Sequence, residues 1–395
     1  MKNNNEFDFI GVNKIAVMLL GVYIFICTFE PIVNKFIGGI TKYLGLILII
    51  IYISIFIKNN YRIKITLFSL SFIGWIFIEL LSIFWGGYNS QVSNQLLGRV
   101  SIVILLVILT SIDYSLQCKK YIINSLYFSN AFMAMLFVIF PMFRMKLVES
   151  RYTFYMWGVY IDPNNIAAFL LVTFTIALYK LIIGEKNIWL NTVILIISCI
   201  AIFLTASRAA FLTILLLSIF LIIYNDEFKL NNVGKIIVRT VIAIILMYTF
   251  YLLLNKLLDS NILDRVLDFE SYKGGSERSN IWQESINAIC KRPIFGYGWG
   301  SYINSSNYSI LLGIHNTFLV FLYEIGFVGC SFVVIGLMNI VYKAKKMKNI
   351  LPVIILITGM IPSFFIDASN KRFFWNSIII SYILLTYKKD LIKRD

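Results

Sequence analysis

Long apolar runs separated by short polar segments make up most of this 395-residue chain. Many of the runs have about 17–25 residues, the length with which an α-helix crosses the hydrocarbon core of a bilayer. The pattern predicts an all-α membrane protein with about twelve transmembrane helices. The predicted spans are 11–30, 42–58, 65–85, 98–113, 121–142, 164–183, 188–205, 207–224, 236–254, 314–340, 350–367 and 373–388.

The stretch 255–313 interrupts this pattern because it is polar and much longer than a connection between two helices requires. Loops of that size are usually functional. We therefore divide the chain into residues 1–254 with nine spans, a large loop 255–313, and residues 314–395 with three spans and a tail.

An amphipathic helix is predicted inside the large loop. Trp282, Ile286 and Ile289 have the spacing of one helical face. Ser276, Ser279 and Asn280 are candidate caps, and Pro293 marks the end. Such a helix is expected to lie along the membrane surface with its apolar face down.

The distribution of lysine predicts the orientation. Short loops such as KNNYRIK (58–64) and YKAKKMK (342–348) are basic, which places them and both termini in the cytoplasm and the large loop outside. The net charge of +15 is then a feature of topology and lipid headgroups. The charges form no contiguous basic face, so we expect no nucleic-acid partner.

Arginine is distributed in the opposite way. Eight of the eleven arginines fall on the predicted outer side, which the orientation rule does not explain. Guanidinium groups bind phosphate oxygens in pairs, so the set indicates an outward-facing site for a phosphorylated ligand. Contact with lipid headgroups and pairing with Asp and Glu are the alternatives. The eight are Arg99, Arg144, Arg151, Arg208, Arg265, Arg278, Arg292 and Arg372.

Acidic residues in or beside the spans also gather in the outer half, which favours a polar chamber open to the outside. A transporter would instead require such groups near the membrane midplane and in both halves. These residues are Glu30, Glu79, Asp162, Glu324 and Asp367.

His315, the single histidine, begins the span after the large loop. Its imidazole can accept a proton near pH 7, although a histidine at a helix end is often a hydrogen-bonded structural residue. Glu324 lies on another face of a straight helix and is expected to pair with an arginine elsewhere. The five scattered cysteines show no metal-ligand spacing, so we expect no zinc site. Acids of the large loop leave a calcium or magnesium role open, but no ligand spacing supports one, and we expect no metal and no cofactor.

Glycines alternate with aromatic residues just before that span, in PIFGYGWGSY (293–302). Glycines so closely spaced either cradle a phosphate or allow close approach of two backbones. The aromatic rings either stack on sugars or belong to an interfacial belt. In the earlier DPNN segment, Asp162 is expected to cap the helix that Pro163 begins.

Taken together, four pieces of the chain resemble the O-antigen ligase and polymerase superfamily of bacterial envelopes. The resemblance implies a GT-C-like glycosyltransferase that takes glycan from undecaprenyl pyrophosphate, without a metal, at the outer side of the bacterial cytoplasmic membrane. The pieces are Arg151 with Asp162-Pro163-Asn164, then Ser207-Arg208, then Arg278 and Trp282 with RPIFGYGWG (292–300), and finally HNTFLVFLYEIGFVG (315–329).

The residue chemistry fits that reaction. His315 is the candidate base that deprotonates a sugar hydroxyl, while Arg208 and Arg278 stabilise the charge that develops on the leaving pyrophosphate. Direct displacement would invert the anomeric centre. The candidate substrate-binding residues are Arg151, Asn164, Asn316, Glu324, Arg292 and Trp282.

A polymerase of O-antigen or capsule repeat units is the first hypothesis, with lipid-linked oligosaccharides as donor and acceptor and a chain-length regulator as a further partner beside the membrane lipids. A ligase that passes the glycan to a lipid A core sugar carries the same motifs and is the alternative. A polysaccharide transporter or flippase is the hypothesis from another class, and it predicts two related halves, which the sequence does not show.

Overall fold

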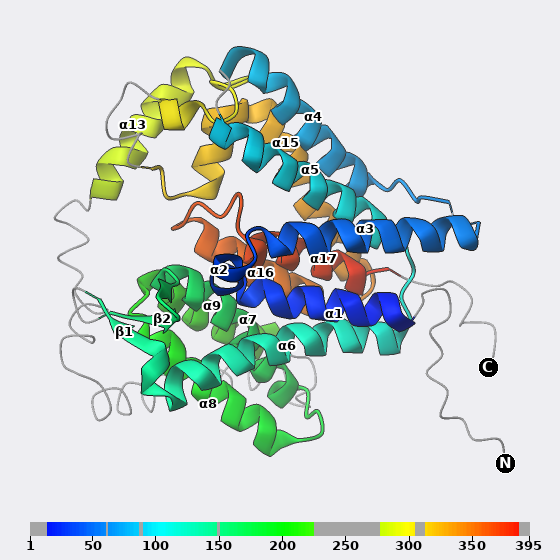
Figure 1. The fold of residues 1–395 in the computed structure, drawn as a ribbon, viewed down its shortest axis with the longest axis vertical. Coiled ribbons are helices and arrows are strands. Elements are labelled where there is room, and N and C mark those ends of the chain that lie inside the picture. Colours follow the sequence, from blue (N-terminus) through cyan, green and yellow to red (C-terminus); the bar gives the residue numbers. More distant parts are fainter. Residues whose placement is uncertain are drawn as a thin grey trace. The chain divides into compact units, whose positions relative to one another are not determined.

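The computed structural model describes residues 14–60, 62–86, 90–147, 151–224, 277–304 and 313–386. The predicted helical character is confirmed, with one small sheet added (Figure 1). Among these residues five helices are long and apolar enough to cross a membrane, or six if the bent pair α1–α2 is one span. The protein is therefore an integral membrane protein. The count of about twelve spans stays a prediction, and span 236–254 and Arg265 lie outside the described residues.

Contacts divide the chain into two compact units. Unit 1 contains Met1–Glu30, Ile37–Ser125 and Gly275–Asp395, and unit 2 contains Pro31–Phe36 and Leu126–Gly274. The predicted division of the chain into 1–254, 255–313 and 314–395 follows the order of spans and loops in the sequence and not spatial contacts. It stays a prediction. Each unit is described by itself below.

Unit 1 is a helical bundle in which α4 packs along α15 (Figure 1). Glycines allow this approach, because a Cβ on Gly74 would lie 2.6 Å from the Phe332 ring and one on Gly336 would lie 2.6 Å from the Phe72 ring. Its elements are α1 (Lys14–Thr28), α3 (Ile40–Lys58), α4 (Leu67–Gly86), α5 (Ser90–Thr110), the start of α6 (Leu116–Ile139), α13 (Glu277–Lys291), η3 (Ser301–Asn304), α15 (Thr317–Lys346), α16 (Leu351–Ser363) and α17 (Arg372–Leu384).

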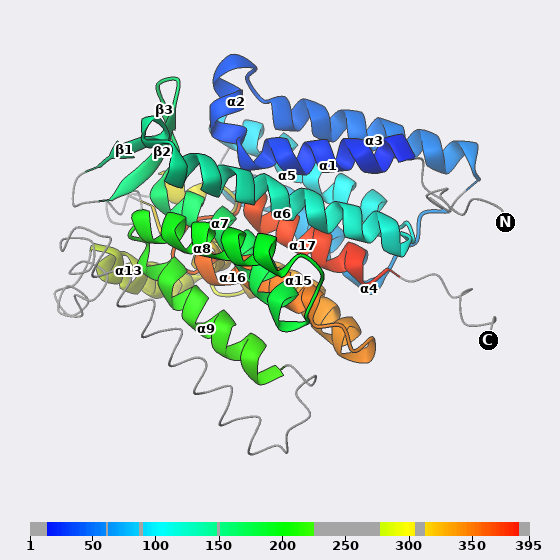
Figure 2. The ribbon, with the colours of Figure 1, turned by 90° about the horizontal axis from the view of Figure 1, so that it is seen from below.

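Unit 2 is built around α7 (Pro163–Ile182), which packs on α8 (Ile188–Leu204), on α9 (Arg208–Tyr224) and on strand β2 (Figure 2). The expected cap at the start of α7 is confirmed, because the Asp162 side chain accepts from the amides of Asn164 and Asn165 and Pro163 follows it. The stretch from Ile166 to Leu178 is buried without interruption, and it is apolar on every face apart from Thr173 and Thr175.

A three-stranded antiparallel sheet in unit 2 was not predicted. It runs β1 (Arg144–Lys146), β2 (Tyr152–Met156) and β3 (Val159–Tyr160) in that order, after the short helix η1 (Pro141–Phe143). Thr153 and Phe154 of β2 are buried, and Phe154 stacks on Phe143 with ring centroids 5.9 Å apart. Aromatic and β-branched residues favour strands, but these strands are so short that their sequence cannot be told from a continuation of the neighbouring apolar spans. The sheet was therefore not predicted.

The first predicted span, 11–30, contains α1, and a second helix that was not predicted follows it after a sharp bend. Helix α1 ends at Thr28, and α2 (Glu30–Phe36) leaves it at an angle of 92°. Pro31 in the first turn of α2 cannot continue a hydrogen-bonded helix from α1, which accounts for the position of the bend.

Helix α15 is interrupted at Gly326, whose φ of 61° and ψ of −167° are not helical. The backbone groups released there are bound by residues 293–300, which we call the glycine strap. Tyr297 and Gly298 donate to the carbonyls of Tyr323 and Glu324, each at 2.8 Å. In the other direction, the amides of residues 327 and 328 donate to the carbonyls of Pro293 and Ile294. The strap therefore satisfies the break, as buried backbone groups require.

Close backbone approach, and not phosphate cradling, explains the glycines of the strap. A Cβ on Gly298 would lie 2.3 Å from Gly86 Cα, and one on Gly296 would lie 2.6 Å from the Glu324 carbonyl oxygen. All four amides from residue 297 to residue 300 are bound within unit 1. The phosphate-cradle interpretation is therefore wrong, because these donors are already used.

We predict that alanine at Gly298 or Gly326 destabilises the protein by about 1–3 kcal/mol, because each Cβ meets backbone atoms and each glycine has a positive φ. Gly98→Ala is the matched control, since a Cβ there meets nothing within 4 Å. Chemical denaturation of the three variants in detergent checks this. Equal stability of Gly298→Ala and Gly98→Ala would contradict the role of the strap.

Candidate active site

His315 is held in an unusual backbone conformation at the start of α15. Its φ is 49°, a left-handed value that is uncommon for a non-glycine residue, and its side chain is exposed. The preceding carbonyl, that of Ile314, accepts a hydrogen bond from Trp282 Nε1 at 2.8 Å. The following residue, Asn316, caps α15 by accepting from the amides of Phe318 and Leu319. Strain of this kind persists only where neighbours fix it, and it is common at functional sites.

Thr317 connects this segment to residues 364–371, which we call the α16–α17 loop. Its hydroxyl donates to the Ile366 carbonyl at 2.8 Å and accepts from the Ala368 amide at 2.8 Å. Thr317 is fully buried, so both bonds are shielded from water. The position of His315 is thus coupled to the α16–α17 loop through the second residue after it.

Arg278 contacts the same loop. Its Nη1 lies 3.5 Å from the carbonyl oxygen of Phe365, and its side chain is half-buried in the first turn of α13. Two residues of unit 1 therefore bond to one short loop between α16 and α17: the predicted catalytic residue Arg278, and Thr317, which lies two residues after His315.

Helix α13 is confirmed close to its predicted bounds, but its buried face differs from the predicted one. Ile281, Ser285 and Ile289 are buried, whereas Ile286 is 42% exposed. Ile281, Ser285 and Ile289 follow the i, i+4, i+8 spacing of one helical stripe. The prediction missed this stripe because it searched for apolar residues and one member of the stripe is a serine. Trp282 flanks this stripe and packs against the cluster of Ile289, Ile314, Val320 and Tyr323.

Arg292 and Trp282 were predicted to bind substrate, and that role stays a prediction. The structure places Arg292 at the surface with its Cζ 4.9 Å from the centre of the Tyr297 ring. Tyr297 in turn stacks on Tyr323 with ring centroids 4.8 Å apart. The Tyr297 ring therefore contacts two protein groups, the ring of Tyr323 and the guanidinium of Arg292.

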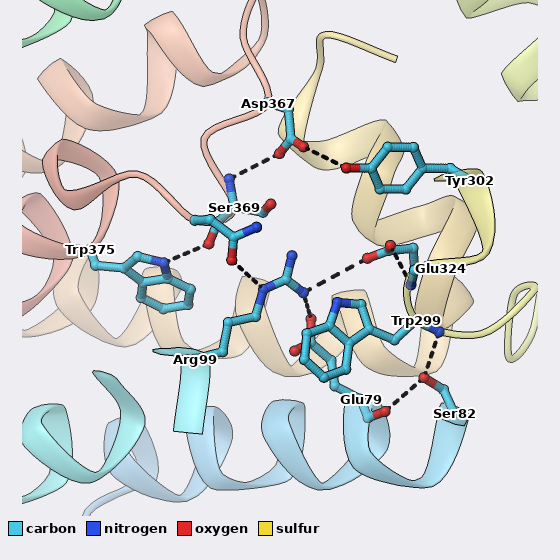
Figure 3. A network of polar contacts seen from close by, with 11 residues as sticks. Glu79, Ser82, Arg99, Trp299, Tyr302, Glu324, Asp367, Ser369 and Trp375 are labelled. Atoms are coloured by element: carbon cyan, nitrogen blue, oxygen red, sulfur yellow. Dashed lines mark hydrogen bonds and ion pairs between the residues drawn. The ribbon is translucent and has the colours of Figure 1, made fainter. Parts of the chain in front are cut away.

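Glu324 has the arginine partner that its helical position predicted. Its Oε2 lies 3.8 Å from Arg99 Nη1, and its Oε1 accepts from the Gly300 amide at 2.7 Å (Figure 3). Arg99 also forms an ion pair with Glu79, and all three side chains are almost completely buried. Arg99 is thus not an outward-facing residue, and pairing with acids is the correct interpretation for it.

Arg372 is the second arginine of the outer set that is buried. Its Nε lies 3.3 Å from Glu30 Oε1, and its Nη2 donates to Thr41 Oγ1 at 3.3 Å. Ion pairing within unit 1 therefore accounts for Arg99 and Arg372, and the hypothesis of phosphate binding is confined to the remaining arginines.

Asp367 lies on the α16–α17 loop close to the same cluster. Its Oδ1 accepts from the Ser369 amide at 3.0 Å, and its Oδ2 accepts from the Tyr302 hydroxyl at 3.4 Å (Figure 3). Burial raises the pKa of Tyr302, and the nearby Asp367 and Glu324 carboxylates raise it further. The hydroxyl therefore stays protonated and acts as a donor.

Unit 2 brings together the other two pieces of the sequence pattern. Asn164 Oδ1 accepts from Arg151 Nη2 at 2.9 Å and from Ser207 Oγ at 3.0 Å. Arg151 Nε also donates to the Thr205 carbonyl at 3.2 Å. These bonds fix the turn that precedes Arg208, the first residue of α9, whose side chain is half-buried. Three predicted residues, Arg151, Asn164 and Arg208, are thus connected within unit 2.

The cluster around Arg99 was missed at the level of the sequence. Glu79, Arg99 and Glu324 were each noticed separately, as acids in spans or as an arginine on the outer side. Their grouping could have been predicted from the presence of one cation and two acids within spans, because an unpaired charge is costly there and such residues tend to pair. The covering ring of Trp299, 5.0 Å from Arg99 Cζ, carries no such signal.

Two comparisons show which known proteins this sequence is similar to. Residues 193–334 match a family model described as O-antigen ligase. The chain is also 23% identical over 319 residues to the "ComP-specific O-oligosaccharyltransferase" of Acinetobacter baylyi (strain ATCC 33305 / BD413 / ADP1), which covers 77% of this chain and 53% of that protein. The chain spans about half the length of this curated relative. The family match includes Arg208, Arg278, His315 and the glycine strap.

We predict that Asn164→Leu lowers the free energy of unfolding by about 1–3 kcal/mol, because it removes the shared acceptor of Arg151 and Ser207. Asn165→Leu is the control, since the side-chain oxygen of Asn165 has no hydrogen-bond partner among the described residues. Chemical denaturation in detergent measures both. A larger loss in Asn165→Leu than in Asn164→Leu would refute the connecting role of Asn164.

Proposed function

We propose that this chain, a member of the O-antigen ligase and polymerase superfamily, transfers a glycan from a lipid pyrophosphate to a hydroxyl group at the outer face of the bacterial cytoplasmic membrane. The observation that carries the proposal is the single histidine, exposed and held with a positive φ by its neighbours inside the matched region. In the proposed topology both termini are cytoplasmic.

His315 is the proposed general base. A neutral imidazole accepts the proton of the attacking hydroxyl as its oxygen bonds to the anomeric carbon. The Trp282 bond to the Ile314 carbonyl, the Asn316 cap and the Thr317 bonds restrict the backbone on both sides of His315. A base fixed in this way loses little conformational freedom when the acceptor binds, which supports the assignment.

Arg208 and Arg278 are the proposed partners of the leaving group, with Arg151 as the third. As the bond between the anomeric carbon and the pyrophosphate oxygen breaks, the electron pair leaves with the pyrophosphate, and guanidinium groups stabilise the charge. The proton goes to His315, so no metal or further reactant is required for balance. A single displacement of this kind inverts the anomeric centre.

The acceptor defines two candidate functions. A polymerase would transfer the chain from undecaprenyl pyrophosphate onto another lipid-linked repeat unit of an O-antigen or capsule, with a chain-length regulator as partner. A ligase would transfer it to a different acceptor, such as a lipid A core sugar. The descriptions of the matched family and of the relative are both of the ligase type. They make the ligase at least as well supported as the polymerase. Neither describes a transporter.

We predict that His315→Ala, Arg208→Ala and Arg278→Ala each lower the transfer rate, by about 10²–10⁴ for the base and about 10²–10³ for each arginine. Arg62→Ala, at an exposed position on the predicted cytoplasmic side, is the matched control. The measurement is transfer of a labelled lipid-linked oligosaccharide by purified protein, with membrane levels verified. Wild-type rates in all three variants would remove the site assignment.

Deletion of the gene separates the two candidate functions. Loss of a polymerase leaves single repeat units on the final acceptor, because ligation continues, whereas loss of a ligase leaves no attached glycan and an intact pool of lipid-linked chains. Gel analysis of surface glycan and of extracted lipid-linked chains from the deletion strain provides the measurement. Attached chains of normal length would argue against both functions.

A further inference from the structure

A buried cluster of charged and aromatic side chains in unit 1 has no role assigned in the proposed proton transfer or leaving-group stabilisation, although one member, Glu324, was predicted to bind substrate. We call Glu79, Arg99, Trp299, Glu324 and Asn370 the Arg99 cluster. Figure 3 labels the first four of these residues. Arg99 is 1% exposed, and the carboxylates of Glu79 and Glu324 are buried with it. Burying three ionisable side chains is costly, and apolar residues of similar volume often stabilise a core as well. The cluster is therefore poorly explained as a device for stability alone.

Each partner of Arg99 belongs to a different segment. Glu79 lies on α4, while Glu324 lies on α15 just before the break and holds the strap through the Gly300 amide at 2.7 Å. Trp299 of the strap covers the guanidinium with its ring, and its amide donates to Ser82 Oγ at 2.9 Å. One side chain thus contacts both sides of the interface between the strap and the helices.

The fourth partner connects Arg99 to the α16–α17 loop. Arg99 Nε donates to Asn370 Oδ1 at 3.0 Å while Nη1 binds Glu79. The same loop binds two residues of the candidate site. The Phe365 carbonyl accepts from Arg278, and the Ile366 carbonyl accepts from Thr317. The planar guanidinium can direct donors to Glu79 and to Asn370 at once, which a lysine ammonium on its flexible chain does less well.

We propose that Arg99 is a positioning residue for glycan transfer. By binding Asn370 it sets the place of the α16–α17 loop, and through this loop it sets the places of Arg278 and of the segment that carries His315. The inference rests on the proposed function, because it assigns Arg99 a role in the rate of that same reaction.

Asn370→Ala is the most informative variant. Asn370 is exposed, so its truncation removes the bond to Arg99 Nε and leaves the buried ion pair intact. We expect the kcat for transfer to fall about 10- to 100-fold, as for small displacements of catalytic groups, with the KM for the lipid-linked donor close to that of the wild type. The melting temperature should fall only modestly, because one donor of Arg99 loses its partner. Asn370→Asp keeps an acceptor oxygen for Arg99 and should restore most of the rate.

Hydrogen exchange measured by mass spectrometry gives a readout that does not depend on transfer. In Asn370→Ala, amides of the α16–α17 loop should exchange faster, whereas those of the strap, held by Glu324 and Ser82, should not change. Arg99→Lys should accelerate exchange in both segments and lower kcat. Asn287→Ala, exposed on α13, is the control that should resemble the wild type.

The outcomes separate this inference from the proposed function. An Asn370→Ala enzyme with wild-type kcat overturns the positioning role, whatever the exchange shows, and so does a variant whose only defect is a lower melting temperature. Unchanged exchange in the α16–α17 loop overturns the physical connection even if transfer is slow. Absence of transfer by the wild-type protein counts against the proposed function, while the exchange measurements still decide whether Asn370 restrains the loop.

Discussion

The break of α15 at Gly326 is the constraint on which the arrangement of unit 1 depends. Within an apolar bundle every backbone donor and acceptor needs a partner, so a helix can be interrupted only where another segment supplies the missing bonds. The strap supplies them in both directions, from Tyr297 and Gly298 and to Pro293 and Ile294. Because no side chain fits between the two backbones, the glycines are a consequence of this pairing.

The sequence predicted the elements of this arrangement better than their contacts. Helical runs, the Asp162 cap and helix α13 follow from local patterns, and the pairing of Glu324 with an arginine follows from the cost of a buried charge. The identity of that arginine does not follow, because residues 99 and 324 are distant in the chain. Ile286 was wrongly predicted to face the core, because apolar periodicity does not register that Ser285 is the buried residue. The strands beside Arg151 were missed, because they are too short to give a periodic pattern.

Each unit fixes one part of the proposed chemistry by the same means. In unit 2 one amide oxygen, that of Asn164, accepts from Arg151 and Ser207 and so restrains the turn before Arg208. In unit 1 one loop accepts from Arg278 and Thr317 and so restrains the neighbourhood of His315. In both cases the reactive or charged side chain lies within two residues of a residue that is bonded to a second segment. A protein can in this way fix a group that must itself stay accessible to substrate.

The costs in this fold occur where the proposed function requires them. A left-handed backbone at His315 and three buried ionisable side chains around Arg99 both lower stability relative to simpler alternatives, namely a relaxed turn and an apolar core. The two features are connected through the α16–α17 loop, by Asn370 at one end and by Ile366 at the other. A bundle selected for stability alone would need neither feature. A transferase that holds a base beside a lipid pyrophosphate needs the backbone around that base to stay in place when the substrates enter and leave. The connection of the strained backbone to the buried ionisable groups through one loop therefore supports a catalytic interpretation of His315 more strongly than the histidine does by itself.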